Sequence, residues 1–360
     1  MKKKLLFISQ PQYGYQIDYF NYCKYLIKDF DITYICFDYG NDKILNDNIK
    51  IVYVKSIENK FKSKLYFFRE VINQIKTNEI DICFVYYYLG CLLLPLFYSN
   101  KKIKYVLDIR SGSVTFNKVK RKIINTLICF ESFFFNHISI ISEGLRKDLF
   151  IPKKKSFILP LGCDPISTKT KIFSTSLIHL LYIGTFNNRN IHETIYGLND
   201  FILKNPDKKK SLRYTIIGSG DESSVFKIKK SIIDSNLTDC VQLKGYIKNS
   251  ELLQYFEDAN IGVSYVPITK YYDNQPPTKT YEYLQAGMPV IATATKANKS
   301  IINKYNGVLI KDTYIDFSEK LGQVVDNMES YDSSVIKKTV RNNTWKIIVN
   351  KLSQHLQSIV

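Results

Sequence analysis

The chain has 360 residues, which is long for one hydrophobic core and sufficient for two domains of ordinary size. Its hydrophobic content of 45% excludes a disordered chain. The formal net charge of +18 leans to the first half, where residues 1–165 carry 26 Lys and Arg against 15 Asp and Glu. Such an excess attracts nucleic acid, anionic membranes or anionic substrates. Because no zinc spacing, RNA-binding aromatic pattern or basic zipper accompanies the charge, we expect no nucleic-acid partner.

Hydrophobic runs and helical periodicity alternate along the chain and predict two parallel sheets with crossover helices. In the first half we expect strands at 4–9, 32–37, 51–54, 82–86, 104–108, 138–141 and 156–159, and helices near 16–28, 61–76, 118–135 and 142–150. In the second half we expect strands near 178–183, 213–217, 240–243, 261–264, 289–292 and 307–310, and helices near 191–203, 222–235, 249–257, 279–286 and 314–328. The predicted domains are therefore 1–165 and 166–330, with a helical tail at 331–360.

Two apolar segments could be mistaken for membrane elements. The run that follows Met1 is too short for a signal peptide and meets Pro11, so we interpret it as a first strand. Residues 82–98 contain Gly90 and Pro95 and are better interpreted as strand, turn and helix than as a membrane span. The seven cysteines are odd in number and lack a C-x-x-C pair, which favours reduced thiols and a cytoplasmic protein.

The segment 276–293 reads as an anion-binding helix start that leads into a buried strand. Two prolines precede Thr278, which is well placed as the N-cap of a short helix, and Lys279 adds a cation beside the free backbone amides. Gly287 supplies a left-handed residue after the helix, and Pro289 blocks further winding. The pattern alone is also compatible with an ordinary capped helix.

This segment resembles the donor-binding motif of GT-B glycosyltransferases of family 4, a Pro-Thr-Lys-x-x-Glu-Tyr helix followed by Ala-Gly-x-Pro-Val-Ile. Further pieces match that family in the expected order: Leu159-Pro160-Leu161-Gly162-Cys163-Asp164, Leu181-Tyr182-Ile183-Gly184-Thr185, Ile216-Ile217-Gly218-Ser219-Gly220 and Val241-Gln242-Leu243-Lys244-Gly245-Tyr246. The resemblance implies two Rossmann-like domains facing a cleft, with the C-terminal helix crossing back to the first domain. It also implies a retaining glycosyltransferase that moves a sugar from a UDP- or GDP-sugar to a hydroxyl of a glycan or lipid-linked acceptor, in surface polysaccharide assembly.

The resemblance assigns roles to residues of the second domain. Arg189 and Lys279 would neutralise the donor diphosphate, and Glu282 would bind the ribose hydroxyls. The family's first signature carboxylate is replaced or shifted here, so Asp273 or Asn274 would meet the sugar hydroxyls. Further donor-binding candidates are Thr278, Thr280, Gly184 and Tyr246. Many family members have a Lys where this chain has Asn190.

In the first domain, the loops that follow strands carry the candidate residues. Asp108 and Arg110 follow the fifth strand and are candidate catalytic groups, or alternatively an ion pair that shapes the loop. Gly14 and Tyr15 follow the first strand and could form an acceptor or phosphate loop, although a plain turn fits as well. The His that family members often place in the loop after the fifth strand is missing.

The resemblance implies no cofactor and no metal, because basic residues and a helix N-terminus would stabilise the leaving diphosphate. The run Asp29-Phe30-Asp31 is the sole D-x-D and is interpreted as chance. Two alternatives stay open: a catalytically degenerate nucleotide-sugar-binding protein and a GT-B nucleotide-sugar epimerase.

The basic first half also suggests a membrane partner. Lysines at 118–122 lead into an aromatic, apolar stretch that ends at Phe135, a pattern typical of an interfacial helix. A packed helix with a solvated basic start is the alternative. We therefore expect a cytoplasmic protein, with peripheral contact to the anionic inner membrane face as a hypothesis.

Overall fold

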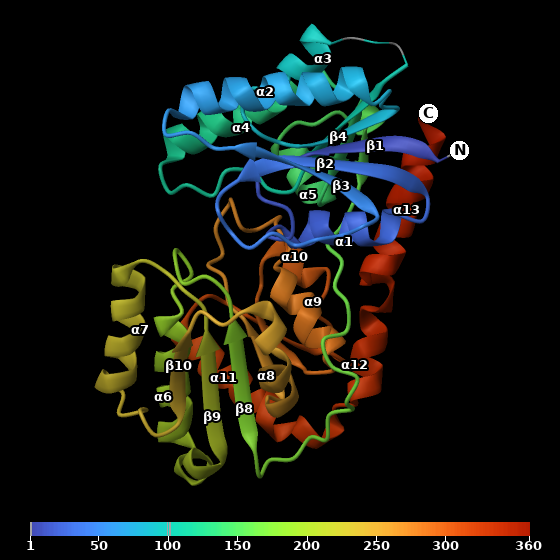
Figure 1. Ribbon diagram of the computed structural model, residues 1–360. Helices are drawn as coiled ribbons and strands as arrows, with labels where there is room; N and C mark the ends of the chain where they lie inside the picture. Colours follow the sequence, from blue (N-terminus) through green and yellow to red (C-terminus); the bar gives the residue numbers. More distant parts are fainter. Residues whose placement is uncertain (1, 99, 101) are drawn as a thin grey trace. The chain divides into compact units, whose positions relative to one another are not determined.

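The computed structural model describes residues 2–98, 100 and 102–360. The chain forms two compact units, one made of 1–162 together with 345–360 and the other of 163–344. Each unit is built around one parallel sheet with helices on both faces (Figure 1). Two Rossmann-like domains, predicted from the alternating pattern, are thus confirmed.

The first unit contains a seven-stranded sheet in the order β3-β2-β1-β4-β5-β6-β7. Its strands are β1 (Lys3–Ile8), β2 (Phe30–Asp38), β3 (Ile49–Lys55), β4 (Ile82–Tyr86), β5 (Lys104–Ile109), β6 (His137–Ile140) and β7 (Ser156–Ile158). Its helices are α1 (Ile17–Leu26), α2 (Lys60–Thr77), α3 (Leu93–Phe97), α4 (Lys118–Ser132), α5 (Glu143–Asp148) and α13 (Trp345–Ser358). The strand order reverses between β1 and β4, and crevices form beyond the strand ends at such a switch point.

Aromatic rings fill the core between this sheet and the pair α1 and α13. Phe7 of β1 meets Phe84 of β4 at 5.3 Å between ring centroids, and Tyr22 of α1 meets Trp345 of α13 at 5.9 Å. On the opposite face α2 packs through Phe67, whose ring lies 4.6 Å from that of Phe37. Figure 1 shows α1 and α13 on one side of this sheet and α2 and α4 on the other.

The second unit contains a six-stranded parallel sheet in the order β10-β9-β8-β11-β12-β13, with its switch point between β8 and β11. Its strands are β8 (Ile178–Ile183), β9 (Leu212–Ile217), β10 (Val241–Gly245), β11 (Ile261–Ser264), β12 (Val290–Thr293) and β13 (Gly307–Ile310). Its helices are α6 (His192–Lys204), α7 (Glu222–Asp234), α8 (Leu253–Asp258), α9 (Thr278–Gln285), α10 (Lys296–Lys299), α11 (Tyr314–Asp326) and α12 (Ser333–Thr339).

The boundaries of the units differ from the predicted ones at the C-terminal tail. The tail was expected to return to the first domain from residue 331, but α12 lies in the second unit and only 345–360 join the first. Packing explains the difference, because Ile336 of α12 is fully buried and Val340 accepts a hydrogen bond from the Gln285 side chain of α9. From Trp345 on, α13 contributes its apolar side to the first core.

No helix in the described part of the chain combines the length and the apolar character needed to cross a membrane. Residues 82–98 form β4, a turn and α3, as the glycine and proline in that segment indicated.

Candidate functional site

The helix α9 starts at Thr278 and follows Pro277, whose extended backbone ends the preceding loop. Thr278 was expected to be the N-cap, and this is wrong by one position. Pro277 occupies the N-cap and offers no side-chain cap, because proline carries no hydrogen-bonding group on its ring. At the other end Gly287 has the expected left-handed backbone, with φ of 76°.

A cavity of about 250 Å³ lies where the start of α9 meets the loops after three neighbouring strands. Gly184 and Thr185 follow β8, and Gly218 and Ser219 follow β9. Together with Lys279 of α9 these residues bound the space, and the complete lining is Ile183, Gly184, Thr185, Ile217, Gly218, Ser219, Tyr246, Ile247, Asn249, Leu252 and Lys279. The cavity lies at the carboxyl edge of the sheet beside the β8–β11 switch point, where open α/β sheets bind ligands.

The loop after β8 and the loop after β9 approach each other so closely that a side chain at Gly218 would not fit. Gly218 has φ of 152°, and a methyl group at its Cα would lie 1.8 Å from the carbonyl oxygen of Gly184. Gly184 N donates to Ile217 O at 3.0 Å, and Gly218 N donates to Gly245 O at 2.8 Å. The loops therefore form a rigid, side-chain-poor wall that allows a ligand to approach the backbone.

Lys279 and Glu282 form an ion pair on α9. Their side-chain atoms Nζ and Oε2 are 2.5 Å apart, one turn of the helix from each other. Lys279 also lines the cavity, whereas Glu282 does not. The two residues expected to hold the diphosphate and the ribose thus contact each other.

Arg189 stacks on an aromatic ring. Its guanidinium carbon lies 4.1 Å from the ring centroid of Tyr272, which is buried. The residues on either side of it, Asn188 and Asn190, have left-handed backbones with φ of 63° and 52°. Asparagine tolerates this conformation better than lysine, which gives a physical reason for Asn190 in place of the family's Lys. Arg189 is absent from the cavity lining.

Three other candidates for the donor site have structural partners. Thr280 is fully buried and exchanges hydrogen bonds with Ser264 and Asn298, which fixes α9 to β11 and α10. The carboxylate of Asp273 accepts from the backbone N of Lys296 at 2.7 Å and pairs with its Nζ at 3.1 Å. Asn274 follows Asp273 in the same loop and also has a bonding partner. Their role in sugar binding stays a prediction.

Asp108 and Arg110 lie inside the first unit and not at an open surface. Asp108 is fully buried and bonds to the hydroxyl of Ser139 on β6. Arg110 pairs with Asp18 of α1 at 2.7 Å and donates to Leu159 O at 2.6 Å. Burial raises the pKa of Asp108 to about 6, against the opposing effects of Arg110 and the Ser139 hydrogen bond. The alternative interpretation, an ion pair between Asp108 and Arg110, is wrong, because Arg110 pairs with Asp18 instead. The catalytic role of Asp108 and Arg110 stays a prediction.

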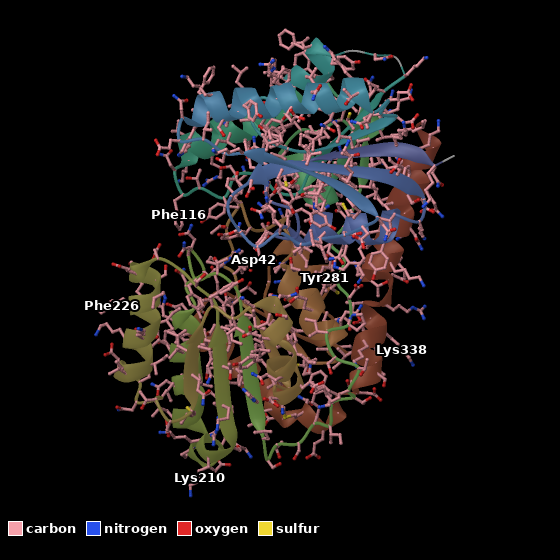
Figure 2. The ribbon with its side chains drawn as sticks, in the orientation of Figure 1. Asp42, Phe116, Lys210, Phe226, Tyr281 and Lys338 are labelled. Carbon is pink, nitrogen blue, oxygen red and sulfur yellow. The ribbon has the colours of Figure 1, made fainter. Side chains whose placement is uncertain are left out.

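Gly14 and Tyr15 form a turn after β1, with φ of 90° at Gly14. The hydroxyl of Tyr15 donates to the backbone carbonyl of Asp42. Asp42 lies in the loop that follows β2 and is labelled in Figure 2. Tyr15 also lines a second cavity, of about 400 Å³, which belongs to the first unit alone.

Sequence reasoning found part of the second unit's cavity and missed the rest. Gly184, Tyr246 and Lys279 were predicted as donor-binding residues, and all three line it. Ser219 and Asn249 were not predicted. Ser219 directly follows Gly218, and Asn249 lies four residues after Gly245, so both stand close behind a glycine at the end of a strand. This position is the signal that could have identified them.

No group of three or more His, Cys, Asp or Glu side chains among the described residues is arranged to hold a metal ion. Asp29, part of the D-x-D run, accepts a hydrogen bond from Ser353 of α13 at 2.6 Å. That aspartate has a structural partner within the first unit.

The arrangement of two Rossmann-like domains with a returning C-terminal helix is the GT-B fold. Solved structures with this arrangement cover nearly the whole chain. Sucrose-phosphate synthase from Thermosynechococcus elongatus matches with a TM-score of 0.79 and 14% identity over 99% of both chains. The Anabaena protein HepE, solved in complex with UDP, matches with a TM-score of 0.75 and 12% identity over 99% of this chain and 100% of its own. A glycosyltransferase from Rickettsia africae matches with a TM-score of 0.75 and 15% identity over 99% and 98%.

The second unit also matches a family by sequence. Residues 178–327 fit the family model described as glycosyl transferases group 1, and this range includes every residue that lines the cavity at α9. No curated protein matches the chain by sequence.

Proposed function

We propose that this protein is a retaining glycosyltransferase that moves a sugar from a nucleotide-diphosphate sugar to a hydroxyl group of a glycan or lipid-linked acceptor. One observation carries the proposal: the cavity at the β8–β11 switch point joins backbone-lined glycine loops to Lys279 at a helix start without a side-chain cap. Backbone amides, a positive helix end and a mobile cation are the groups that bind a phosphate. The family match of 178–327 and the UDP in the HepE structure support the same class of ligand.

In this proposal the leaving diphosphate lies at the start of α9. Lys279 exchanges its contact with Glu282 for a phosphate oxygen, which frees the Glu282 carboxylate to accept hydrogen bonds from the ribose. Arg189 is held by Tyr272 in the loop after β8 and turns its planar guanidinium toward the second phosphate. These positive groups would stabilise the charge that grows on the diphosphate as the glycosidic bond breaks. Tyr246, 74% exposed, offers a ring for the nucleobase.

The retaining outcome and independence from metal belong to the proposal. In a retaining transfer the leaving phosphate would help to take the proton from the acceptor hydroxyl while the sugar keeps its anomeric configuration. Neutralisation by Arg189, Lys279 and α9 would leave a divalent ion unnecessary for this step.

The direct test is thermal stabilisation of the full chain by UDP, GDP, ADP and CMP and their sugar conjugates, in the presence of EDTA. A selective rise of the midpoint with one diphosphate is expected, because a ligand that binds only the folded state stabilises it by mass action. The matching sugar conjugate is then supplied with acceptors, and the anomeric configuration of the product is read by NMR. No shift with any nucleotide would contradict the proposal.

The same experiment separates the two alternatives. Binding without turnover would indicate a degenerate nucleotide-sugar-binding protein. Isomerisation of the donor sugar without an acceptor would indicate an epimerase.

We further propose that the enzyme works in the cytoplasm, in polysaccharide assembly, with α4 in contact with an anionic membrane. Helix α4 buries only Ile128, Glu131 and Ser132, while Val119, Ile123 and Phe130 are each more than half exposed. Lys118, Lys120 and Lys122 stand at its start, after Phe116, which Figure 2 labels. Lysines beside exposed apolar side chains suit an interfacial helix. All seven cysteines are free, which supports a reducing compartment.

Co-sedimentation with vesicles tests this contact. We expect binding to phosphatidylglycerol vesicles at low salt and weaker binding when Ile123→Ser and Phe130→Ser are combined. The matched control is Leu203→Ser on α6, a residue 73% exposed outside the patch. Failure to sediment at low salt would contradict the membrane contact and leave the transferase proposal unaffected.

A further inference from the structure

The strands β8 and β11 separate at the switch point of the second sheet. Their backbone ladder extends as far as Leu181 and Gly262. Beyond this point β8 continues along β9, and β11 continues along β12. Alternate amides of a strand face opposite neighbours, and Gly184 N is bonded to β9, so the amide of Ile183 faces the gap toward β11. A buried amide in such a gap needs a hydrogen-bond partner.

Tyr283 of α9 fills this gap. Its side chain is fully buried, and the amide of Ile183 donates to its hydroxyl oxygen at 2.8 Å. The ring packs on the backbone of β11, because a methyl group at Gly262 would lie 2.4 Å from the ring carbon Cγ. The glycine at 262 thus provides the room for the ring. One side chain of α9 therefore contacts both strands that diverge at the switch point.

A second tyrosine holds the loop after β8. The hydroxyl of Tyr182 donates to the carbonyl of Thr185 at 2.8 Å, which closes the turn across Gly184. Burial raises the pKa of both tyrosines above the ordinary value of 10, so both hydroxyls are neutral at pH 7. The segment 183–185 is therefore held as one piece, and the hydroxyl of Tyr283 joins that piece to α9.

These contacts connect two walls of the cavity at α9. Residues 183–185 form one wall, and Lys279 at the start of α9 belongs to another. Tyr283 follows Lys279 by four residues, so about one turn of helix separates them. The position of the Tyr283 side chain thus determines how far Lys279 lies from the glycine loop.

We propose that Tyr283 is a positioning residue of the donor site, whose hydroxyl holds the loop 183–185 at the distance from Lys279 at which one diphosphate contacts both. Groups that are held in place before binding gain more affinity than groups that must be ordered by the ligand. Tyr283 is outside the cavity lining and would act through Ile183 and α9. This inference rests on the proposed transferase function and adds a residue that supports it without a contact to the ligand.

The test removes a single oxygen atom. Tyr283→Phe keeps the ring against Gly262 and leaves the amide of Ile183 without its partner. We expect the variant to bind the nucleotide diphosphate found in the thermal screen about five- to tenfold more weakly, which is comparable with the contribution of one hydrogen bond. Its affinity for the nucleoside alone should stay at the wild-type level. Titration calorimetry below the melting range of each protein measures both affinities.

Tyr214→Phe is the matched control. The Tyr214 side chain is fully buried in the same unit, and its hydroxyl forms a hydrogen bond of 2.9 Å with the hydroxyl of Thr194. Tyr214 is likewise outside the cavity lining. Both replacements remove a buried hydrogen bond and should lower the melting midpoint. Only Tyr283→Phe should change the ratio of diphosphate affinity to nucleoside affinity, which a purely structural role would leave unaltered.

Hydrogen exchange gives a readout that needs no nucleotide. The amides of residues 183–185 should exchange about tenfold faster in Tyr283→Phe than in the wild type, because the hydrogen bond to Ile183 N is lost and the loop opens more often. The same amides should exchange at the wild-type rate in Tyr214→Phe. Mass spectrometry of peptides that contain this segment measures the rates on the full chain.

The outcomes separate this inference from the proposed function. Equal diphosphate affinity in Tyr283→Phe and the wild type, equal losses for diphosphate and nucleoside, or the same change of ratio in Tyr214→Phe would each overturn it. If the wild type binds no nucleotide, the transferase proposal fails by itself. Faster exchange at 183–185 in Tyr283→Phe alone would then still support the positioning of the loop, and unchanged exchange would overturn it.

Discussion

Arg189 lies over the ring of Tyr272, with 4.1 Å between the guanidinium carbon and the ring centroid. This contact links the loop after β8, which carries Arg189, to the segment before α9, which carries Tyr272. The position of Arg189 in the proposed donor site therefore depends on the Tyr272 ring. Left-handed backbones on both sides of Arg189 restrict the loop further. Among the described residues, the guanidinium of Arg189 contacts an aromatic ring and no carboxylate, which leaves its charge available for an anion.

Replacement of Tyr272 tests this support. Tyr272→Leu should lower kcat about tenfold, since a misplaced guanidinium stabilises the transition state poorly, while binding of the nucleotide diphosphate changes less. Tyr272→Phe keeps the ring and should retain near wild-type activity. Steady-state kinetics with the donor found in the thermal screen provide the measurement. Equal activity of the Leu and Phe variants would show that the stacking has no role in turnover.

The ion pair on α9 predicts a specific pattern of binding energies. Glu282→Ala should weaken binding of the nucleotide diphosphate by about tenfold, because a hydrogen bond to a charged group contributes roughly 1.5–3 kcal/mol and the loss is partly offset by a freed Lys279. Lys279→Ala should weaken the diphosphate more than a nucleoside. Titration calorimetry with both ligands separates the two effects. If Glu282→Ala leaves the affinity unchanged, the ribose assignment is wrong.

The buried carboxyl of Asp108 predicts a pH-dependent stability. Burial raises its pKa to about 6 from an ordinary value of 3.8, so between these values the folded chain binds more protons than the unfolded chain. The free energy of unfolding should therefore fall as the pH rises from about 4 to 6, by at most about 1.4 kcal/mol per pH unit, and then level off.

Asp108→Asn removes this titration while it keeps a partner for Ser139. We expect the variant to lose the fall in stability between pH 4 and 6 and to be at least as stable as the wild type at pH 7. Urea unfolding at a series of pH values measures the difference. A variant with the same pH profile as the wild type would assign the titration to another group.

Lys171 predicts a structural effect in the second unit. Its ammonium donates to the carbonyls of Phe256, Glu257 and Ala259 at the end of α8. Burial lowers its pKa to about 8, so most of the group is still charged at pH 7. A cation at a helix C-terminus that satisfies three free carbonyls should stabilise the unit by about 2 kcal/mol.

Lys171→Met should therefore lower the free energy of unfolding by about that amount. The control is Lys169→Met, since Lys169 makes a single ion pair with Glu257 and its side chain is 69% exposed. An exposed pair of this kind contributes no more than about 1 kcal/mol. Equal losses in the two variants, measured by urea unfolding, would contradict the role given to Lys171.

The strands and most helices could be predicted from the sequence, because buried parallel strands are continuous apolar runs and the helices alternate with them. Short elements were harder. Helix α10, four residues long, was missed since its start depends on a cap by Thr295 and on contacts with Asp273, which follow from tertiary structure. The unit to which residues 331–344 belong depends on the tertiary contacts that bury Ile336, and no local sequence pattern predicts those contacts.

The residues of the candidate site could be predicted where strand ends and helix starts determine their position. They could not be predicted where the position depends on side-chain hydrogen bonds formed in the tertiary structure. Gly184 and Lys279 follow from strand ends and a helix start. Thr280 was predicted to bind the donor, but its buried hydroxyl forms hydrogen bonds with Ser264 and Asn298. Asp108 was expected where the fifth strand ends, but it lies within β5 and is fully buried. Which way a side chain turns at a strand end is set by the packing of the other elements.

The return of α13 to the first unit has a consequence for synthesis on the ribosome. The second unit is one continuous segment, 163–344, and can complete its core as soon as that segment has emerged. The first unit begins earlier but lacks Trp345 and the apolar side of α13 until the second has been made. In the nascent chain the apolar surface around Tyr22 therefore stays exposed until α13 has been synthesised. The unit that is synthesised first is thus the last to become stable.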